Sequence, residues 1–151
     1  MTSVYDSPVG PLLLTSDGTF LTGLTFGEGT QKQQGGDDEV ISLCKRQLDE
    51  YFAGWRREFS VPLLASGTRF RQRVWNALQD IPYGETITYQ TLAKRIGQPK
   101  ACRAVGGANH HNPISILIPC HRVVGSNGQL TGYGGGLPIK DFLLTLEGKI
   151  T

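Results

Sequence analysis

The stretch from residue 88 to residue 109 constrains the fold most, because it holds two short helical patterns separated by one glycine-containing turn. Thr88 has a side chain suited to cap the first helix, and Gly97 closes that helix. Pro99 is typical of a first helical turn, so a second helix is expected over residues 100 to 109. Two short helices joined in this way form a helix-turn-helix.

The second of these helices carries almost no large side chains. Its small residues are Ala101, Ala104, Gly106, Gly107 and Ala108. A glycine costs about 1 kcal/mol against alanine in a helix, so two in succession need a reason. Close approach to a nucleic-acid groove would supply one, with Arg103 as the one long side chain on a smooth surface. Tight packing against another helix, with Arg103 in solvent, explains the same pattern.

A cysteine followed directly by a histidine stands at the end of a short apolar run. Residues 116 to 118 are apolar and precede Pro119, which is consistent with a buried strand that delivers Cys120 and His121. The thiolate is the reactive form of cysteine, and a neighbouring base or cation makes it available near neutral pH. Cys120 is therefore a candidate nucleophile. Most free cysteines pack as small buried hydrophobes, and these two residues alone leave both interpretations open.

The last helix is expected to begin with Pro138 and to end before Gly148, which suits the position after a helix C-cap. Its apolar residues on one face are Ile139, Phe142, Leu143 and Leu146. Glu147 falls in the last turn, where the helix dipole disfavours an anion. The carboxylate is therefore either an incidental surface group or a group held by a cation.

The N-terminal half predicts a small antiparallel sheet followed by one helix. Residues 3 to 26 contain runs of strand-forming residues, and the Asp17-Gly18 dipeptide between them is a hairpin turn signal. Asp38 or Asp37 would cap a helix that Gly54 ends. Nothing in this half indicates chemistry.

Charge is divided unevenly along the chain. Residues 1–66 hold nine acidic and five basic residues, a net charge of −4, whereas residues 67–151 hold four acidic and ten basic residues, a net charge of +6. This split suggests two units, of which the second meets an anionic partner. With the elements expected above, the chain is predicted to be an α+β protein with domains 1–62 and 67–151.

The three cysteines, Cys44, Cys102 and Cys120, are an odd number without a C-x-x-C pair, which argues against disulfides and predicts a cytoplasmic protein. Cys44 lies on the apolar face of its helix and is expected in the core. No signal peptide is recognisable, and no apolar run approaches the ~20 residues that span a bilayer. No metal site is expected, because the adjacent His110 and His111 cannot easily share one ion.

Several short motifs occur together and in order in the second half. They are Tyr89-Gln90, Arg103 to Ala108, Asn112-Pro113, Ile118 to Val123, Gly132-Tyr133 and Leu143 to Gly148. This set closely resembles the O6-alkylguanine-DNA alkyltransferase family, the methylated-DNA–protein-cysteine methyltransferases, over residues 67 to 149. The resemblance implies a ribonuclease H-like N-terminal domain and a winged-helix-like helix-turn-helix domain after it.

The activity implied by the resemblance is DNA repair by direct reversal of damage. The alkyl group on guanine O6 would move once and irreversibly to Cys120, without a cofactor. The target nucleotide is expected to leave the base stack, because O6 lies at the groove edge of a stacked base and the sulfur must attack in line. The expected partner is double-stranded DNA, bound by a monomer in the minor groove with little sequence preference. Activity on O4-alkylthymine is left open.

The resemblance also implies roles for individual residues. Glu147, His121 and a bridging water would activate Cys120, and Asn112 would hold the segment around the cysteine. The DNA-binding residues implied are Tyr89, Arg103, Ala101, Ala104 and Gly106. The residues implied for the alkylguanine pocket are Tyr133, Val123, Gly134 and Gly135. Arg103 would fill the gap left by the flipped base, and Tyr89 would press on the phosphate beside it.

Two features depart from the family pattern. Many relatives carry a serine or another side chain after the pocket tyrosine, where this chain has Gly134. Some relatives hold a structural zinc in the N-terminal half. That half contains no histidine here and only one cysteine, Cys44, so no zinc is expected.

Two other functions fit a helix-turn-helix chain of this size. A non-catalytic protein could bind alkylated DNA and recruit other repair factors, but relatives of that kind lack the cysteine found here at position 120. A transcription regulator could use the helix-turn-helix to read one DNA sequence. Equal binding to random duplexes would count against the regulator.

Overall fold

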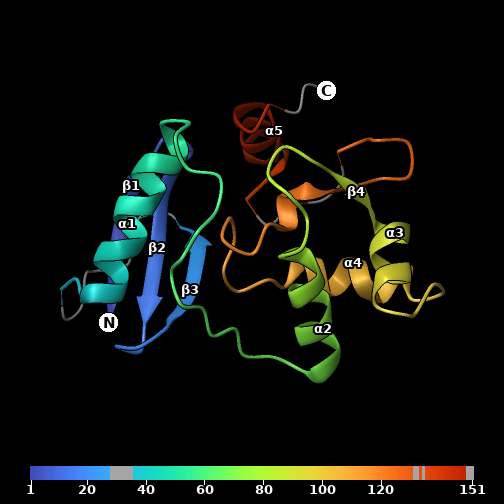
Figure 1. The fold of residues 1–151 in the computed structure, drawn as a ribbon, viewed down its shortest axis with the longest axis horizontal. Helices are drawn as coiled ribbons and strands as arrows, with labels where there is room; N and C mark the ends of the chain where they lie inside the picture. The colour runs from blue at the N-terminus through green and yellow to red at the C-terminus, as the bar shows by residue number, and fades with distance from the viewer. Residues whose placement is uncertain (28–35, 131–132, 134, 149–151) are drawn as a thin grey trace. The chain divides into compact units, whose positions relative to one another are not determined.

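The residues described by the computed structural model are 1–27, 36–130, 133 and 135–148 (Figure 1). The chain divides into two compact units, Met1–Ser66 and Gly67–Thr151. Each unit combines helices with a small sheet, so the predicted α+β fold class is confirmed. Over the ranges given above, no helix has both the length and the apolar character needed to cross a membrane.

The first unit is built on a three-stranded antiparallel sheet. Its strands, adjacent in chain order, are β1 (Thr2–Ser7), β2 (Gly10–Ser16) and β3 (Leu21–Phe26). The turn between β2 and β3 uses the predicted dipeptide. Asp17 accepts hydrogen bonds from the backbone amides of Thr19 and Phe20 at 2.9 and 2.8 Å, and Gly18 supplies a φ of 98°. Glycine adopts this positive φ without steric cost.

Helix α1 (Glu39–Phe52) packs on this sheet, and Figure 1 shows it running alongside the strands. Asp38 is the N-cap, as predicted, and its carboxylate accepts a hydrogen bond from the amide of Ile41 at 2.8 Å. The buried residues of the helix are Val40, Ile41, Cys44, Gln47, Leu48 and Tyr51. Cys44 is fully buried, so its predicted place in the core is confirmed.

The second unit contains the helix-turn-helix and a two-stranded parallel sheet. Its elements are α2 (Arg69–Leu78), β4 (Ile87–Thr88), α3 (Tyr89–Arg95), α4 (Cys102–His110), the 3₁₀ helix η1 (Cys120–Arg122), β5 (Val123–Val124) and α5 (Leu137–Leu146). Helices α2, α3 and α4 pack against one another, and β4 pairs with β5. Thr88 caps α3 by accepting a hydrogen bond from the amide of Thr91 at 3.1 Å, as predicted.

Helix α4 begins later than the sequence predicted. Its first residue is Cys102, because Gln98 to Ala101 form a separate turn in which the amide of Ala101 donates to the carbonyl of Gln98 at 2.9 Å. Pro99 therefore takes the second position of a turn, which its fixed φ also suits, and does not open the helix.

The predicted strand before Cys120 is absent. Ile116 has a φ of 73°, which is outside the range of a strand, and the amide of Ile118 donates back to the carbonyl of Ile114 at 3.0 Å. The segment is a buried, locally closed loop, and Cys120 begins η1. The apolar run predicted the burial correctly but not the conformation.

Helix α5 buries a different face from the one predicted. The buried positions are Lys140, Leu143 and Leu144, whereas Phe142 is 39% exposed. Glu147, the C-cap, is also buried, so the buried stripe runs along positions 140, 143, 144 and 147. That stripe has the same helical spacing as the predicted one, shifted by one residue, with a charged group at each end.

Candidate active site

Cys120 lies at the start of η1 and is almost completely buried. Burial raises the pKa of its thiol. Hydrogen bonding with the side chains of Asn112, Tyr133 and Ser115, together with the charge of Lys140, acts in the opposite direction. The sulfur is therefore a protonated thiol at rest, surrounded by groups that favour its anion.

Asparagine side chains hold the loop that carries Cys120, and the amide nitrogen of Asn109 donates to the carbonyl of Cys120 at 3.4 Å. The amide nitrogen of Asn112 donates to the carbonyl of Ile118 at 2.7 Å, and its amide oxygen accepts from the backbone of Ile114 at 3.0 Å. Asn112 thus closes the buried loop from both ends and fixes where Pro119 and Cys120 emerge. This geometry is what the resemblance implied for Asn112.

His121 is fully buried and forms a close pair with the carboxylate of Glu147. Its Nε2 lies 2.8 Å from Oε2 of Glu147. Burial lowers the pKa of His121, with the charges of Arg122 and Lys140 acting in the same direction and Glu147 opposing them. The ring is therefore neutral, with the proton on Nε2, because an ionised carboxylate can only accept. The other nitrogen, Nδ1, has no hydrogen-bond partner among the described residues and remains an acceptor.

Glu147 is a buried carboxylate held by two positive or polar partners besides His121. The guanidinium of Arg122 donates through Nε to Oε1 at 2.8 Å and through Nη2 to Oε2 at 3.0 Å, and the amide of Gly84 lies 3.4 Å from Oε1. Burial raises the pKa of Glu147, but its bonds to His121 and Arg122 outweigh burial and hold the pKa well below the usual range. The carboxylate is therefore held by a cation and is not an incidental surface group.

Two buried cations of this site were missed from the sequence. Arg122 also donates through Nη1 to the carbonyl of Ile81 at 2.7 Å, and Lys140 donates through Nζ to the carbonyl of Val123 at 2.6 Å. Burial lowers the pKa of Lys140 to about 8, while the nearby Cys120 raises it. Their signals in the sequence were weak: Arg122 follows the Cys-His pair directly, and Lys140 stands two helical turns before Glu147.

The predicted pocket residues differ in how far they are buried. Val123 and Tyr133 are buried, and Gly135 is half-buried. Tyr133 is one of the side chains that act to lower the pKa of Cys120, against the effect of burial. Gly134 lies outside the described residues.

Helix α4 presents the small, open surface that its composition predicted. Arg103 and Ala104 are exposed, whereas Val105 and Ala108 are buried. The indole nitrogen of Trp75 on α2 donates to the carbonyl of Ala108 at 2.9 Å and holds α4 on its buried side.

The two glycines of α4 are not required by packing inside the protein. A Cβ at Gly106 would come no closer than 3.9 Å to the ring of Tyr89, and a Cβ at Gly107 would meet nothing within 4 Å. Tight helix packing therefore does not explain them. Ala101 is half-buried just before the helix, and Tyr89 is half-buried at the start of α3.

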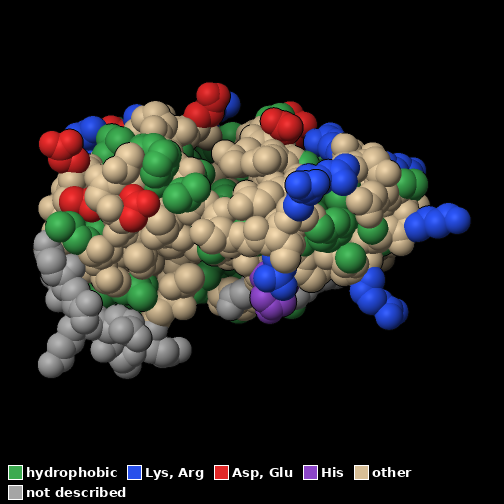
Figure 2. Space-filling model, turned by 90° about the horizontal axis from the view of Figure 1, so that it is seen from below, with side chains coloured by type: hydrophobic (Ala, Val, Ile, Leu, Met, Phe, Trp, Pro, Cys, Tyr) green, Lys and Arg blue, Asp and Glu red, His purple; other side chains and the backbone are tan. Residues whose placement is uncertain are grey.

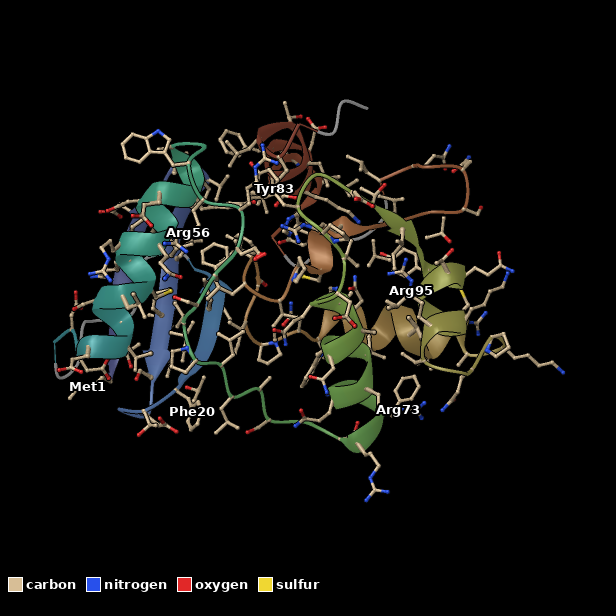
Figure 3. All side chains as sticks on the ribbon, in the orientation of Figure 1. Met1, Phe20, Arg56, Arg73, Tyr83 and Arg95 are labelled. Carbon is tan, nitrogen blue, oxygen red and sulfur yellow. The ribbon has the colours of Figure 1, made fainter. Side chains whose placement is uncertain are left out.

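The part of the chain that contains this helix has basic residues but few acidic ones. No acidic residue occurs between Glu85 and Asp141, a stretch that includes α3 and α4. Figure 2 shows Lys and Arg side chains gathered over the second unit on the face that it draws. In Figure 3, Arg73 on α2 and Arg95 on α3 mark this region. Arg73 donates to the carbonyl of Ile96, at the end of α3.

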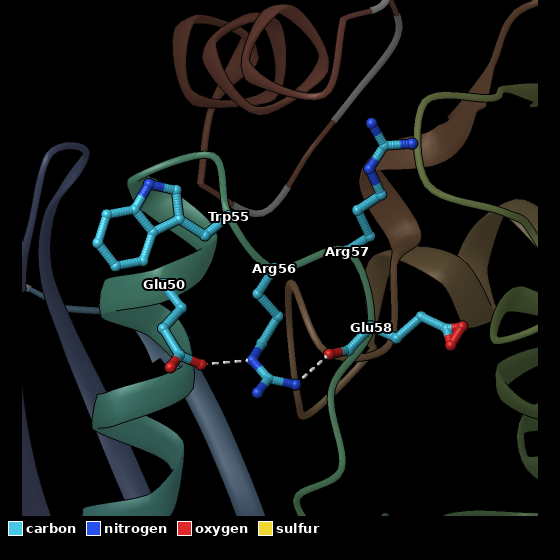
Figure 4. Close-up of a pocket in the computed structure, with 5 residues that line it drawn as sticks. All are labelled: Glu50, Trp55, Arg56, Arg57 and Glu58. Atoms are coloured by element: carbon cyan, nitrogen blue, oxygen red, sulfur yellow. Dashed lines mark hydrogen bonds and ion pairs between the residues drawn. The ribbon is translucent and has the colours of Figure 1, made fainter.

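A pocket of about 350 Å³ lies in the first unit, where none of the predicted site residues occurs. Figure 4 shows its lining, which consists of Glu50, Trp55, Arg56, Arg57 and Glu58. Arg56 is fixed by Glu50 at 2.7 Å and by the carbonyl of Glu58 at 2.8 Å. The pocket holds no nucleophile, and across the described part of the chain no group of three His, Cys, Asp or Glu could hold a metal ion.

Both units match family models of one kind of protein. Residues 1–65 match the 6-O-methylguanine DNA methyltransferase, ribonuclease-like domain, and residues 69–149 match the 6-O-methylguanine DNA methyltransferase, DNA binding domain. The chain belongs to the 6-O-methylguanine DNA methyltransferase family. The family resemblance predicted from the motifs over residues 67 to 149 is therefore confirmed, and the match of residues 1–65 extends it to the first half of the chain.

Individual members of the family are close along the whole chain. The methylated-DNA–protein-cysteine methyltransferase of Methanosarcina acetivorans is 52% identical over 152 residues, which cover 97% of each chain. A crystal structure of Mycobacterium tuberculosis OGT in complex with DNA is 52% identical, with a TM-score of 0.88 over 95% of this chain and 90% of that one. A second M. tuberculosis structure, of O6-methylguanine methyltransferase, is 49% identical, with a TM-score of 0.89 over 99% of this chain and 94% of that one.

Proposed function

We propose that this member of the family repairs alkylated DNA by moving the alkyl group from O6 of guanine onto Sγ of Cys120, once per molecule. One observation carries the proposal. The cysteine adjoins a fully buried His121–Glu147 pair, in a chain that matches the family models from end to end. The reaction needs no cofactor, because the protein supplies the nucleophile and the damaged base supplies the leaving group.

The transfer is a substitution at the alkyl carbon. A bond forms from sulfur to that carbon while the bond from the carbon to O6 breaks, and the electron pair stays on guanine. The thiol loses its proton, and guanine takes one up at N1, so the protons balance. The product thioether is not hydrolysed by any group of this site, which makes the transfer stoichiometric.

The proton acceptor in this proposal is Nδ1 of His121. It is the nitrogen left as an acceptor by the pairing of Nε2 with Glu147, and a water between it and the sulfur completes the route. Glu147 then stabilises the imidazolium, which is the part a buried carboxylate plays beside a catalytic histidine. Lys140 and the hydrogen-bond donors around Cys120 stabilise the sulfur anion before attack.

The DNA-binding surface in this proposal is α4 with the start of α3. The bare face of α4 suits the minor groove, and binding through phosphates and groove shape gives little sequence preference, as a damage scanner needs. Arg103 stands exposed on that face and fills the stack when the damaged nucleotide flips out, while Tyr89 contacts the neighbouring phosphate. The second domain, residues 67–151, thus holds both the DNA surface and the nucleophile, and the protein acts as a monomer.

The cytoplasm is the compartment that suits this chemistry. Cys44, Cys102 and Cys120 are all free thiols, and a reducing compartment keeps the nucleophile from oxidation.

The experiment that tests the proposal is mass spectrometry of the protein after incubation with a duplex that contains one O6-methylguanine. The peptide that contains Cys120 is expected to gain the mass of one methyl group in place of hydrogen, at one equivalent per protein. Cys120→Ala is expected to gain nothing, and in the original chain the peptides that contain Cys44 and Cys102 are expected to stay unmodified. An unmodified Cys120 peptide together with tight binding to the damaged duplex would favour a non-catalytic lesion binder instead.

A further inference from the structure

Arg122 lies two residues after the nucleophile, and its side chain is held by several contacts. Its guanidinium makes three hydrogen bonds, all of them inside the protein: two to the carboxylate of Glu147 and one to the carbonyl of Ile81. Its side chain is only 8% exposed, so this is a buried cation facing a buried anion. No part of the alkyl transfer described above uses it.

The two partners of Glu147 compete for the same negative charge. His121 meets Oε2 through Nε2 at 2.8 Å, while Arg122 engages both oxygens in a fork. A buried carboxylate with no permanent cation beside it would draw a proton onto its histidine partner. The guanidinium never releases its own proton, so it neutralises the carboxylate at every pH of interest.

We infer that Arg122 is a positioning residue that keeps His121 neutral before the transfer, by neutralising Glu147 and holding its Oε2 toward Nε2. The inference rests on the proposed function of Cys120, His121 and Glu147. A neutral His121 offers Nδ1 as an acceptor for the thiol proton, whereas an imidazolium at rest offers only donors. Arg122 thereby decides over which pH range the thiol can lose its proton.

The surroundings fix the guanidinium in this place. The loop between α2 and β4 supplies the carbonyl of Ile81 and the amide of Gly84, and the ring centroid of Tyr83 lies 5.8 Å from the guanidinium carbon. The hydroxyl of Tyr83 in turn donates to the carbonyl of Leu146 at 3.3 Å, next to Glu147 (Figure 3 labels Tyr83). The loop therefore braces both members of the ion pair.

The charged and titratable groups that face His121 are few. Among the described residues they are Glu147 and Lys140 at α5 and Arg122 in η1. The loop between α2 and β4 acts through Glu147 and Arg122, to which it contributes backbone groups and the ring of Tyr83. Lys140 and Arg122 both lower the pKa of His121, and Glu147 raises it. Without Arg122, one positive charge that lowers the pKa of His121 is lost, and the negative charge of Glu147, which raises that pKa, is no longer neutralised. His121 should therefore stay protonated up to a higher pH.

The test measures single-turnover alkylation of Cys120 against pH with free O6-benzylguanine, a small probe that needs no DNA. In the original chain the rate should fall on the acid side as His121 gains a proton. In Arg122→Met the midpoint of that fall should move up by about 1–3 pH units, as expected for the loss of one nearby charge. Arg122→Lys, which keeps a charge without the fork, should shift the midpoint less. Arg69→Met, an exposed arginine at the start of α2, should leave it unchanged.

A second readout is independent of alkylation. The ¹⁵N NMR signals of the His121 ring report its protonation directly, and they should show imidazolium near neutral pH in Arg122→Met but neutral imidazole in the original chain. If Arg122→Met does not fold, Arg122→Met/Glu147→Gln removes both charges, and its His121 should titrate as low as in the original chain. No alkylation of the original chain would refute the proposed function. The NMR titration would still test whether Arg122 keeps His121 neutral.

An unchanged midpoint and an unchanged NMR titration in the variants would overturn the inference. A rate lowered equally at every pH, together with a lower Tm, would show that Arg122 is only a structural brace.

Discussion

Glu147 stands where a helix tolerates a carboxylate least, at the C-cap of α5. It is also buried, which adds a desolvation cost. The fork of Arg122 and the bond to His121 offset both costs, and the carboxylate then orients the imidazole. The placement of Glu147 is unfavourable for α5 itself, and its hydrogen bond to His121 in the neighbouring site explains it.

Glu147→Gln is expected to slow alkylation of Cys120 by about 10²-fold or more, because the amide cannot stabilise the imidazolium that accepts the thiol proton. The measurement is the single-turnover rate on methylated duplex DNA. Glu39→Gln, an exposed carboxylate at the start of α1, is the matched control and should react at the original rate. An unchanged rate in Glu147→Gln would remove the carboxylate from the mechanism.

The same substitution should change the acid stability of the fold. The pKa of Glu147 is lower in the folded chain than its unfolded value of about 4.3, so the carboxylate contributes stability above that pH. The contribution is lost as the pH falls through the folded pKa. Tm should therefore drop less steeply between pH 5 and pH 2 in Glu147→Gln than in the original chain, and parallel Tm curves would contradict this.

At the scale of elements, the glycines of α4 lower its stability as a helix but leave a flat outer surface that fits a groove. Trp75 fixes its buried side, and two glycines leave its outer side flat. In the part of the chain that the structure describes, no atom lies within 4 Å of a Cβ built at Gly107. The instability of a glycine pair is therefore best explained by an external partner that approaches the backbone closely.

Gly107→Ala should stabilise the free protein and weaken its DNA binding. The added methyl meets nothing within 4 Å, and alanine favours a helix over glycine by about 0.5–1 kcal/mol. The same methyl would lie against the wall of the minor groove. Chemical denaturation should show the higher free energy of unfolding, and fluorescence anisotropy should show a severalfold weaker duplex affinity. Unchanged affinity would place the groove elsewhere.

Arg103→Ala should separate DNA handling from chemistry. The side chain is exposed on α4 and takes no part in the hydrogen bonds around Cys120. Alkylation by free O6-benzylguanine should therefore stay near the original rate, while transfer from methylated duplex DNA should slow by about 10-fold or more, since a flipped base costs a few kcal/mol to hold out of the stack. Equal losses on both substrates would show that Arg103 does not act in flipping.

For the molecule as a whole, chemistry and charge are concentrated in one unit. The net charge of residues 67–151 is +6, from ten basic and four acidic residues, and the acid-free stretch between Glu85 and Asp141 contains both α4 and Cys120. Phosphates that approach this surface meet no carboxylate from that stretch. The first unit, with a net charge of −4 over residues 1–66, contributes a sheet and a helix.

Much of the architecture followed from local signals. The hairpin at Asp17-Gly18, the caps at Asp38 and Thr88 and the helix end at Gly97 depend on side chains that bond within a few residues, or on a positive φ. Such signals are contained in the sequence itself. The motif order around Cys120 likewise identified the family without any knowledge of the fold.

Which charged side chains are buried could be seen only in the tertiary structure. Helical periodicity assigns the core face of α5 to its apolar residues, yet the chain buries Lys140 and Glu147 and exposes Phe142. Their partners, Val123 and Arg122, come from a distant part of the chain, and no local pattern marks a charge that will be neutralised there. The looped conformation of residues 116–118 could not be predicted for the same reason. It depends on hydrogen bonds from Asn112, which lies outside the apolar run. Sequence alone determined the family and the residues proposed for the chemistry. Tertiary contacts decided which charges lie beside those residues, because pairing distant buried groups offsets the desolvation that each alone would suffer.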